Sequence, residues 1–311
     1  MKHERALWAV VLAAGEGRRL ASLTRALYGK TLPKQFLAFA GTRSFLQQTL
    51  DRIAPLIPAE RTVVVVSAAR ERMAREQLGD YPGLEIVVQP TDCGTGPGVL
   101  LPLSHVRARD PGAEVVVFPS DHDVKRPQVL LDAVQAARTA AHASPGGLAL
   151  VGAAADRPAT DLGWIEPGPR REGEEGRARL IRRFVEKPHD NLARELLRSG
   201  ALWNTFIVAG RASTLWALAS EVLPAQVAAL ERYVGWIGDP RARAVLEGVY
   251  QEMPHADFSQ GVLEQAVGLA VVPMEDAGWS DCGTPERLVA SFAGTRAFEL
   301  LRLQLQTAGV L

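Results

Sequence analysis

The sequence predicts an α/β protein built on a mixed, mainly parallel sheet that helices cover on both faces. Three observations predict it. Short runs of valine, isoleucine and leucine recur through the first half of the chain, segments with helical periodicity separate them, and polar or glycine-rich loops follow them. Strands that are apolar throughout are typical of parallel sheets buried on both faces, and their alternation with helices produces that arrangement.

Five expected strands lie in the first half of the chain. The first, Trp8–Ala14, is a short apolar run that ends next to a glycine, which is typical of a buried strand entering a loop. The other four are Thr62–Ser67, Glu85–Gln89, Glu114–Pro119 and Leu148–Gly152. Helical patterns separate these strands, as at Phe45–Ala54, and no linker interrupts them. We therefore expect one continuous α/β unit.

The second half is expected to add shorter strands and longer helices. Leu162–Pro169 and Arg179–Glu186 flank a charged, glycine-rich stretch, Arg170–Gly176, which is typical of an exposed hairpin turn. The later expected elements are a helix at Asn191–Ser199, a strand at Asn204–Ala209, helices at Ala212–Leu223, Gln226–Val234 and Pro240–Gln251, a strand at Ala270–Pro273 and a terminal helix at Pro285–Leu305.

The terminal helix sets the expected domain boundary. We divide the chain into a main domain, residues 1–284, and a helical C-terminal segment, residues 285–311. Leu288, Phe292, Leu300 and Leu301 lie along this segment. They can pack either on their own domain or on a second subunit, so a homodimer is one of the two expectations.

Charge and composition exclude several classes of protein. The chain has 311 residues, and its 35 Lys and Arg residues balance its 35 Asp and Glu residues. This balance argues against a strongly basic nucleic-acid-binding protein and against a polybasic membrane anchor. No apolar run approaches the roughly 20 residues that span a bilayer, and Met1–Arg5 leads straight into a strand without a leader pattern. We therefore expect a cytoplasmic protein with no nucleic-acid or membrane partner.

The chain has two cysteines, Cys93 and Cys282, far apart in the sequence. Two cysteines cannot build a disulfide scaffold in a chain of this size, and no Cys-x-x-Cys spacing indicates zinc. We expect neither.

The loop after the first strand is the first candidate for ligand binding, because ligands of α/β sheets bind where strands end. Gly15 and Gly17 let the backbone approach a phosphate closely, and Arg19 adds a charged fork of donors. The dinucleotide pattern Gly-x-Gly-x-x-Gly fails at Leu20, and no Gly-Lys-Ser/Thr completes a P-loop. By itself this loop is either a phosphate loop or an ordinary turn between a strand and a helix.

A lysine follows one loop later, in Pro33-Lys34-Gln35-Phe36-Leu37. Held by the preceding proline, Lys34 can bring a second cation to the same phosphates. A single lysine in a loop is more often solvated, so the segment alone does not decide between the two.

Further motifs follow in a fixed order along the chain. They are Leu46-Gln47-Gln48-Thr49-Leu50, Gln89-Pro90, Gly94-Thr95-Gly96-Pro97-Gly98, Val117-Phe118-Pro119-Ser120-Asp121-His122, Phe184-Val185-Glu186-Lys187-Pro188, Gly200-Ala201-Leu202-Trp203-Asn204-Thr205, Phe258-Ser259 and Gly278-Trp279-Ser280-Asp281-Cys282-Gly283-Thr284. Together with the glycine loop and the Pro-Lys-Gln-Phe-Leu segment, they cover roughly residues 7–290. The set resembles the mannose-1-phosphate guanylyltransferase family of sugar-phosphate nucleotidyltransferases.

The resemblance implies a fold and a reaction. The fold would be the Rossmann-like, GT-A-like fold of nucleotidyltransferases. The reaction would transfer GMP from GTP to mannose-1-phosphate, giving GDP-mannose and pyrophosphate by Mg²⁺-assisted in-line attack on the α-phosphate. Two anionic reactants must meet in such a reaction, so the protein has mainly to neutralise charge and position the groups.

The resemblance also implies roles for individual residues. The catalytic residues would be Arg19, Lys34 and Lys187. The nucleotide-binding residues would be Leu12, Ala14, Gly15, Gly17, Arg18, Gln89, Gly94, Thr95 and Asp121. The substrate-binding residues would be Gly163, Glu186, Lys187 and Asn204, and the Mg²⁺ ligands would be Asp121 and Asp281.

These residue types suit the implied chemistry. A carboxylate at the end of a strand, as at Asp121, can hold a Mg²⁺ that bridges phosphates. Without the resemblance, Asp281 is as readily a turn residue before Gly283. Lys187 is a ligand of the sugar phosphate, a salt-bridge partner of Glu186 or a plain turn residue before Pro188. Two carboxylates so far apart can share an ion only if the fold brings them together.

The sequence departs from the family pattern in three places. Arg18 stands where the family usually has threonine, residues 20–32 lack the usual start of the lid loop, and Asp92-Cys93-Gly94 replaces the commoner Arg-Asn. These departures leave the lid and the base contacts open.

Three alternatives to a guanylyltransferase are weighed. The first is the same chemistry with another base or sugar, such as a UTP- or CTP-using pyrophosphorylase. The second is a non-catalytic protein that senses nucleotide sugars, which the retained charged residues disfavour. A nicotinamide dehydrogenase is disfavoured by Leu20 and by the lack of an acidic ribose ligand after the second strand.

Overall fold

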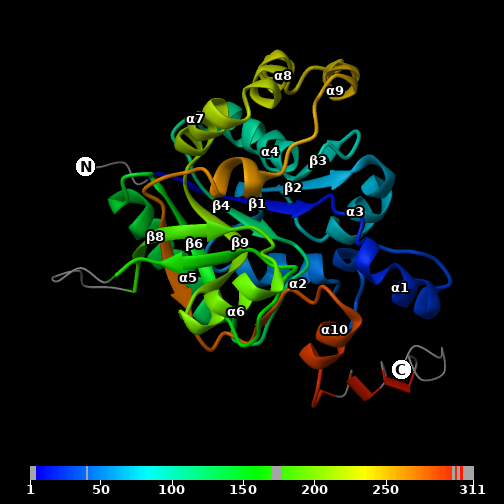
Figure 1. Cartoon of the computed structure of the whole chain (residues 1–311). Coiled ribbons are helices and arrows are strands. Elements are labelled where there is room, and N and C mark those ends of the chain that lie inside the picture. Colours follow the sequence, from blue (N-terminus) through cyan, green and yellow to red (C-terminus); the bar gives the residue numbers. More distant parts are fainter. Residues whose placement is uncertain (1–4, 40, 170–176, 296–297, 300–301, 304–311) are drawn as a thin grey trace.

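The computed structural model describes residues 5–39, 41–169, 177–295, 298–299 and 302–303. Its centre is a nine-stranded sheet with helices on both faces (Figure 1). The strands of this sheet are β1 (Leu7–Ala13), β2 (Thr62–Ser67), β3 (Glu85–Gln89), β4 (Glu114–Pro119), β6 (Leu148–Ala154), β7 (Trp164–Pro167), β8 (Arg179–Val185), β9 (Leu202–Arg211) and β10 (Ala270–Met274). A separate two-stranded ladder joins β5 (Asp123–Val124) to β11 (Trp279–Ser280). The expected turn at Arg170–Gly176 lies outside the described residues.

The strand order is β3-β2-β1-β4-β9-β6-β10-β8-β7, and β7 also pairs with β9. The first four of these strands are parallel to one another, as β6 is to β10. β9 runs antiparallel between β4 and β6, and β8 is antiparallel to β10 and β7. The expected mixed, mainly parallel sheet flanked by helices is therefore confirmed.

Successive residues of the central strands enter two different hydrophobic cores. In β2, Val63 and Val65 face one core while Val64 and Val66 face the other, and all four are fully buried. Because neighbouring side chains of a strand point to opposite faces, a strand covered on both sides is apolar at every position. This explains the continuous valine runs in the sequence.

Helices form a layer on each face of the sheet (Figure 1). One core contains residues of α4 (Thr95–Arg109), α7 (Ala212–Val222), α8 (Pro224–Val234) and α9 (Ala242–Gln251). The opposite core contains residues of α2 (Phe45–Ile53), α3 (Glu71–Leu78), α5 (Pro127–Ala143) and α6 (Asp190–Arg198). No helix in the described part of the chain is both long and apolar enough to cross a membrane. Cys93 and Cys282 are buried free thiols.

The C-terminal segment is helical, as expected, with further helical residues at 298–299 and 302–303, but the prediction of one continuous helix over Pro285–Leu305 is wrong. The helix α10 covers only Pro285–Ser291, and Phe292 follows it as the C-cap. Gly294 has φ +78°, a left-handed conformation that glycine adopts easily and that ends helices. A helical periodicity of leucines did not reveal this break.

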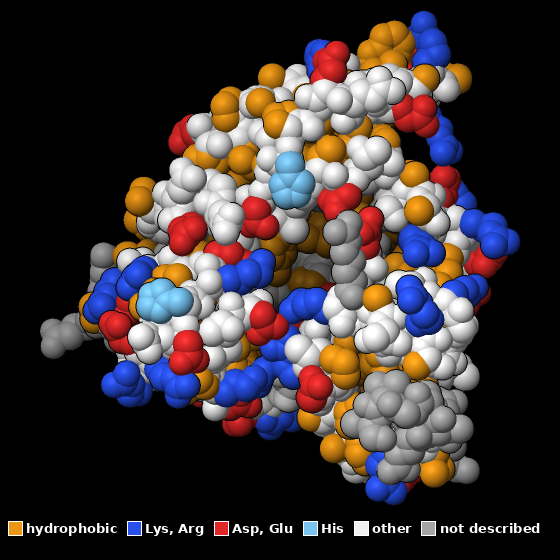
Figure 2. Space-filling view, turned by 45° about the vertical axis from the view of Figure 1, so that its right-hand side comes forward, with side chains coloured by type: hydrophobic (Ala, Val, Ile, Leu, Met, Phe, Trp, Pro, Cys, Tyr) orange, Lys and Arg blue, Asp and Glu red, His pale blue; other side chains and the backbone are white. Residues whose placement is uncertain are grey.

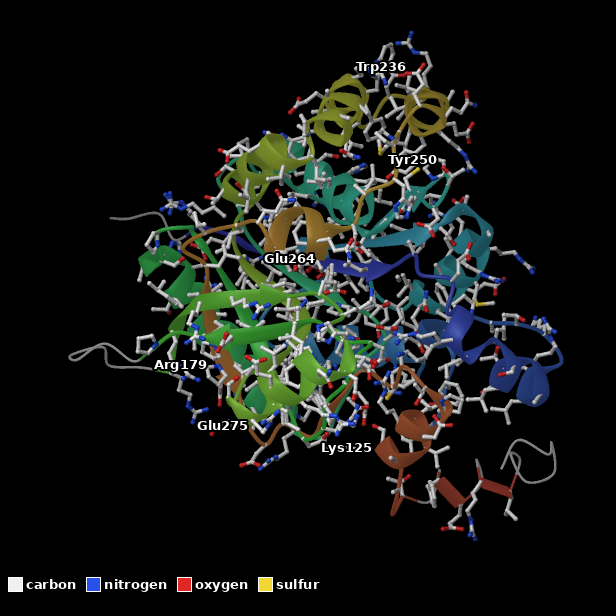
Figure 3. All side chains as sticks on the ribbon, viewed as in Figure 1. Lys125, Arg179, Trp236, Tyr250, Glu264 and Glu275 are labelled. Atoms are coloured by element: carbon white, nitrogen blue, oxygen red, sulfur yellow. The ribbon has the colours of Figure 1, made fainter. Side chains whose placement is uncertain are left out.

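The start of the C-terminal segment packs on its own domain. Leu288 and Phe292 are buried in a small third core with Phe45 and with residues on either side of the start of α1 (Ala21–Tyr28). Lys125 lies beside α10 (Figure 3), with its ammonium 5.0 Å from the centre of the Phe292 ring. The segment was expected to pack either on its own domain or on a second subunit. Its described residues contact their own domain.

Candidate active site

Two adjoining cavities open where the parallel strands end. We call them the Gln89 cavity, of about 290 Å³, and the Asn204 cavity, of about 200 Å³. The Gln89 cavity is lined by Leu12, Ala14, Gly15, Val65, Gln89, Asp92, Gly94, Thr95, Gly98, His255 and Asp257. The Asn204 cavity is lined by Arg19, Thr95, Asp121, His122, Asp161, Leu162, Gly163, Glu186, Lys187, Asn204, Phe206, Asp257, Ser259, Trp279 and Asp281. Thr95 and Asp257 line both, so the two cavities form one cleft.

The surface view shows this part of the molecule as a hollow with basic and acidic side chains around it (Figure 2). The basic side chains can attract an anionic ligand, and the acidic side chains can accept hydrogen bonds from its hydroxyl or N–H groups.

The glycine loop after β1 packs against the Pro33–Leu37 segment and is held by hydrogen bonds from it. Gly17 has φ +66°, and a Cβ on it would lie 3.0 Å from Pro33 Cα and 3.1 Å from Lys34 N. The amide of Gln35 donates hydrogen bonds to Ala13 O (2.9 Å) and Gly15 O (2.7 Å). The loop and this segment therefore form one packed unit. The side chain of Arg18 lies outside the described part of the chain, so its expected role stays a prediction.

Lys34 lies inside the protein, and the solvated alternative does not hold. Its side chain is 5% exposed, and its ammonium is 3.1 Å from Asp121 Oδ2. The ammonium also donates to the carbonyl oxygens of Asp281 and Cys282. Lys34 thus neutralises one expected metal ligand and holds the backbone of the other. Direct contact between Lys34 and a phosphate stays a prediction.

The fold brings Asp121 and Asp281 to the same cavity. The short ladder between β5 and β11 pairs Asp123 with Ser280. Asp121 lies just before β5 and Asp281 just after β11, so the ladder brings both carboxylates to this cavity. His122 lines the same cavity and accepts a hydrogen bond from Trp279 Nε1 at 3.2 Å. Burial lowers the pKa of His122 to about 4, so the imidazole is neutral at pH 7.

The carboxylates fit a magnesium ion in part. Both Asp281 oxygens are buried and accept no hydrogen bond from the described residues, although Arg287 Nε lies 3.1 Å from Oδ1. Carboxylate oxygens are ligands that Mg²⁺ prefers, but here the Arg287 guanidinium already pairs with one of them. The described residues contain no group of three or more His, Cys, Asp or Glu side chains placed for a metal. A Mg²⁺ held here would take its other ligands from water and phosphate, as this ion commonly does.

The expected sugar-phosphate residues meet in the Asn204 cavity. Lys187 adopts φ +47° and its ammonium is 3.2 Å from Glu186 Oε1. Burial raises the pKa of Glu186 despite this ion pair. Asn204 N donates to Gly163 O at 2.8 Å, and a Cβ on Gly163 would lie 2.6 Å from Glu186 Oε2. Contacts therefore link the four residues in sequence, from Lys187 through Glu186 and Gly163 to Asn204, although they come from three separate segments.

Most of the expected nucleotide-binding residues line the Gln89 cavity, but Asp121 lines the Asn204 cavity and Gly17 lines neither. The Gln89 side chain is buried, and its Nε2 donates to Thr91 O at 2.8 Å. Its Oε1 accepts no hydrogen bond from the described residues and remains a buried acceptor. Gly94, at φ +89°, leads into the first turn of α4, where Thr95 Oγ1 donates to Asp257 Oδ2 at 3.1 Å. The N-terminus of a helix attracts anions, which suits phosphates at this end of the cavity.

Three features meet in a single cleft. They are the glycine loop after β1 with its arginine, the carboxylate after β4, and a second carboxylate that β11 places beside the first. A model of the nucleotidyl transferase family matches residues 8–297. The chain belongs to that family.

Relatives of this nucleotidyl transferase include enzymes that act on sugar phosphates. It is 30% identical to "Mannose-1-phosphate guanylyltransferase" of Escherichia coli K12 over 286 residues, which are 89% of this chain and 58% of the relative. It is 31% identical to "Alginate biosynthesis protein AlgA" of Pseudomonas putida over 282 residues, 88% of this chain and 56% of that one. The chain thus spans just over half the length of these relatives.

A solved structure confirms the nucleotidyltransferase fold. A crystal structure from Thermus thermophilus, described as a mannose-1-phosphate geranyltransferase, matches with a TM-score of 0.78 and 30% identity, over 92% of this chain and 79% of that chain. A Helicobacter pylori structure described as a mannose-6-phosphate isomerase matches with a TM-score of 0.67 at 20% identity, over 88% of this chain and 99% of that chain, which supports the fold alone.

The structure of this nucleotidyl transferase adds site residues that the sequence did not reveal. Asp161 lies at the edge of the Asn204 cavity and pairs with both Arg19 and Arg287. His255 and Asp257 line the Gln89 cavity. One residue in the sequence could have indicated Arg287. Thr284 is a typical N-cap residue, and a helix that begins after it places Arg287 in its first turn, beside Asp281. Nothing in the sequence points to Asp161.

Proposed function

We propose that this nucleotidyl transferase transfers GMP from GTP to mannose-1-phosphate and forms GDP-mannose and pyrophosphate. The observation that supports it most is the continuous cleft, in which one cavity carries most of the residues proposed to bind the nucleotide and the other those proposed to bind the sugar phosphate. Thr95 and Asp257 lie at their junction, where the α-phosphate would meet the attacking phosphate oxygen. The likeness to proteins named mannose-1-phosphate guanylyltransferase supports the choice of sugar and base.

In this proposal the basic side chains divide the anionic charge between them. Arg19 and Lys187 extend into the cleft with side chains 59% and 56% exposed, so both can move to meet phosphates. Arg19 neutralises the departing pyrophosphate and Lys187 the phosphate of the sugar. Lys34, buried against Asp121, keeps that carboxylate and the Asp281 backbone in position.

Mg²⁺ is the proposed cofactor. Asp121 and Asp281 would hold it, and when bound it would neutralise phosphate charge in the same cavity. Glu186 and Asn204 supply acceptors and donors for sugar hydroxyls. A site that hydrogen-bonds a hydroxyl discriminates strongly against analogues without it.

The base preference is the part of the proposal with a specific competitor. The buried Gln89 Oε1 needs an N–H donor, and guanine offers two such groups on its Watson–Crick edge. Uracil, cytosine and adenine each offer one, so this acceptor does not by itself select guanine, and UTP- or CTP-dependent transfer is the second candidate. Burying an unpaired acceptor costs about 1–3 kcal/mol, which a base without a correctly placed donor would leave uncompensated.

The test is pyrophosphate release with mannose-1-phosphate, Mg²⁺ and each of the four nucleoside triphosphates in turn. We expect release with GTP, none after chelation of the metal, and recovery when Mg²⁺ is restored. Asp281→Asn should abolish turnover while the circular dichroism spectrum stays unchanged. Release with UTP or CTP alone would overturn the base assignment, and no release with any triphosphate would overturn the reaction.

A further inference from the structure

Asp161 is shared by two arginines that come from distant parts of the chain. Arg19 Nη1 donates to Asp161 Oδ2 at 2.9 Å. Arg287 binds the same carboxylate with both Nη atoms, Nη1 to Oδ1 at 2.9 Å and Nη2 to Oδ2. Two guanidinium groups therefore converge on a single carboxylate oxygen at the edge of the Asn204 cavity. A phosphate oxygen is the other common partner of such an arrangement.

The backbone leaves room for this convergence at Gly283. A Cβ there would overlap Asp281 Oδ2 and would lie 2.6 Å from Arg287 Nη2 and 3.0 Å from Arg19 Nη1. No other residue type fits without moving a charged group. The arginines, Asp161 and Asp281 thus form one packed charge cluster.

The two arginines hold Asp161 unequally. The Arg287 side chain is 13% exposed, makes two hydrogen bonds to Asp161 and is anchored in α10. The Arg19 side chain is 59% exposed and makes one. An exposed, single ion pair is weak, whereas a bidentate pair with a half-buried carboxylate is stronger. The Arg19 contact is therefore the one that an arriving anion can replace.

We propose that Asp161 sets the affinity of the cleft for phosphate, because its carboxylate competes with phosphate oxygens for Arg19 while Arg287 keeps Asp161 in place. This inference rests on the proposed function only in taking the cleft to bind phosphorylated ligands. It assigns a role to two residues, Asp161 and Arg287, that lie outside the set expected from the sequence.

The expected effect is modest and has a definite sign. Exposed ion pairs contribute about 0.2–1 kcal/mol. Freeing Arg19 should therefore tighten phosphate binding by about two- to fivefold, which equals ~0.4–1 kcal/mol at 1.4 kcal/mol per tenfold. Asp161→Asn should show this gain, because the amide keeps the shape of the side chain and loses its charge.

The experiment is calorimetric titration of the full chain with inorganic pyrophosphate, which needs no turnover. Asp156→Asn is the matched control, since Asp156 lies in the same connection between β6 and β7, is exposed and pairs with Arg157. It makes the same change in net charge outside the cavity lining. We expect two- to fivefold tighter binding for Asp161→Asn and no change for the control.

Arg19→Gln shows whether the effect passes through Arg19. In that background Asp161→Asn should no longer tighten binding. An unchanged or weakened affinity in Asp161→Asn alone, an equal gain in the control, or a gain that persists without Arg19 would each overturn the inference.

Loss of the bidentate pair also costs stability, so thermal melting precedes each titration. If Asp161→Asn does not fold, Asp161→Ser, which also removes the charge, is titrated in its place with the same expected gain. Absence of pyrophosphate binding by the native chain also refutes the inference. Normal pyrophosphate binding with this pattern of gains, but no turnover with any sugar phosphate, would refute the proposed reaction and leave the role of Asp161 standing.

Discussion

Gly163→Ala should damage the sugar-phosphate half of the cleft and spare the nucleotide half. The new Cβ would lie 2.6 Å from Glu186 Oε2, 3.2 Å from Asn204 Cβ and 3.3 Å from Phe184 Cζ. A hydrogen bond from Asn204 N to the Gly163 carbonyl oxygen, at 2.8 Å, holds the backbone of Gly163 in place. The Glu186 carboxylate is the one neighbour that can rotate away. The substitution therefore moves the acceptor proposed for a sugar hydroxyl.

The size of the effect follows from the contact that is lost. A hydrogen bond to a charged group contributes about 1.5–3 kcal/mol. We therefore expect KM for the sugar phosphate to rise by about ten- to a hundredfold, at 1.4 kcal/mol per tenfold. KM for the nucleoside triphosphate should change by less than about twofold, because the Gln89 cavity does not include Gly163.

The assay is the initial rate of pyrophosphate release, with each substrate varied while the other is saturating. Gly248→Ala is the matched control: Gly248 lies in α9, and a Cβ there would contact nothing within 4 Å. The control should keep both KM values and gain a little stability, because alanine favours a helix more than glycine does. Equal rises in both KM values, or no rise at all, would refute the reasoning.

Three further predictions concern stability. Glu186→Gln should raise the melting temperature at pH 8 and not at pH 4. Burial raises the pKa of Glu186, so its ionisation destabilises the folded state at pH values above the ordinary pKa of 4.5 and has no effect below that pH. A difference that is largest at pH 4 would contradict this. Lys34→Met should lower the unfolding free energy in urea by about 2–3 kcal/mol, because it leaves Asp121 and two carbonyls unpaired; a loss below ~1 kcal/mol would show that Lys34 holds little in place. Leu288→Ala should cost about 2–5 kcal/mol in the same measurement, since Leu288 is fully buried; a negligible loss would show that α10 does not depend on its contacts with the domain.

Much of the fold could be read from the sequence because its signal is local. The valine runs of β2 and β4 are apolar at each central position, and only a strand covered on both faces requires that. The direction of β9 is not local information, since a strand pairs in either sense with the same residues. The end of α10 was missed because Gly294 lies within a leucine pattern that favoured a continuous helix.

The site divides in the same way. The loops that follow β1 and β4 were predictable from where those strands end, and so were Gly15, Arg19 and Asp121. The pairing of Asp161 with Arg287 joins residues 126 positions apart and depends on how α10 is docked. The sequence did not reveal that the ammonium of Lys34 lies against Asp121, a contact that follows because burial of a lysine requires a nearby negative charge.

The two-residue ladder between β5 and β11 has a consequence for how the chain can change in length. It fixes Asp281 relative to Asp121 through the pairs Trp279–Val124 and Ser280–Asp123. Inserting or deleting one residue between Asp121 and Val124, or between Trp279 and Asp281, would shift one carboxylate by about 3.3 Å along its strand. Such a shift is far larger than the variation of about 0.2 Å in metal–ligand distances, so the proposed Mg²⁺ site would be lost. These two short segments should therefore tolerate conservative substitutions better than an insertion or deletion of one residue. Insertions and deletions should be tolerated better at surface turns of the long stretch between them.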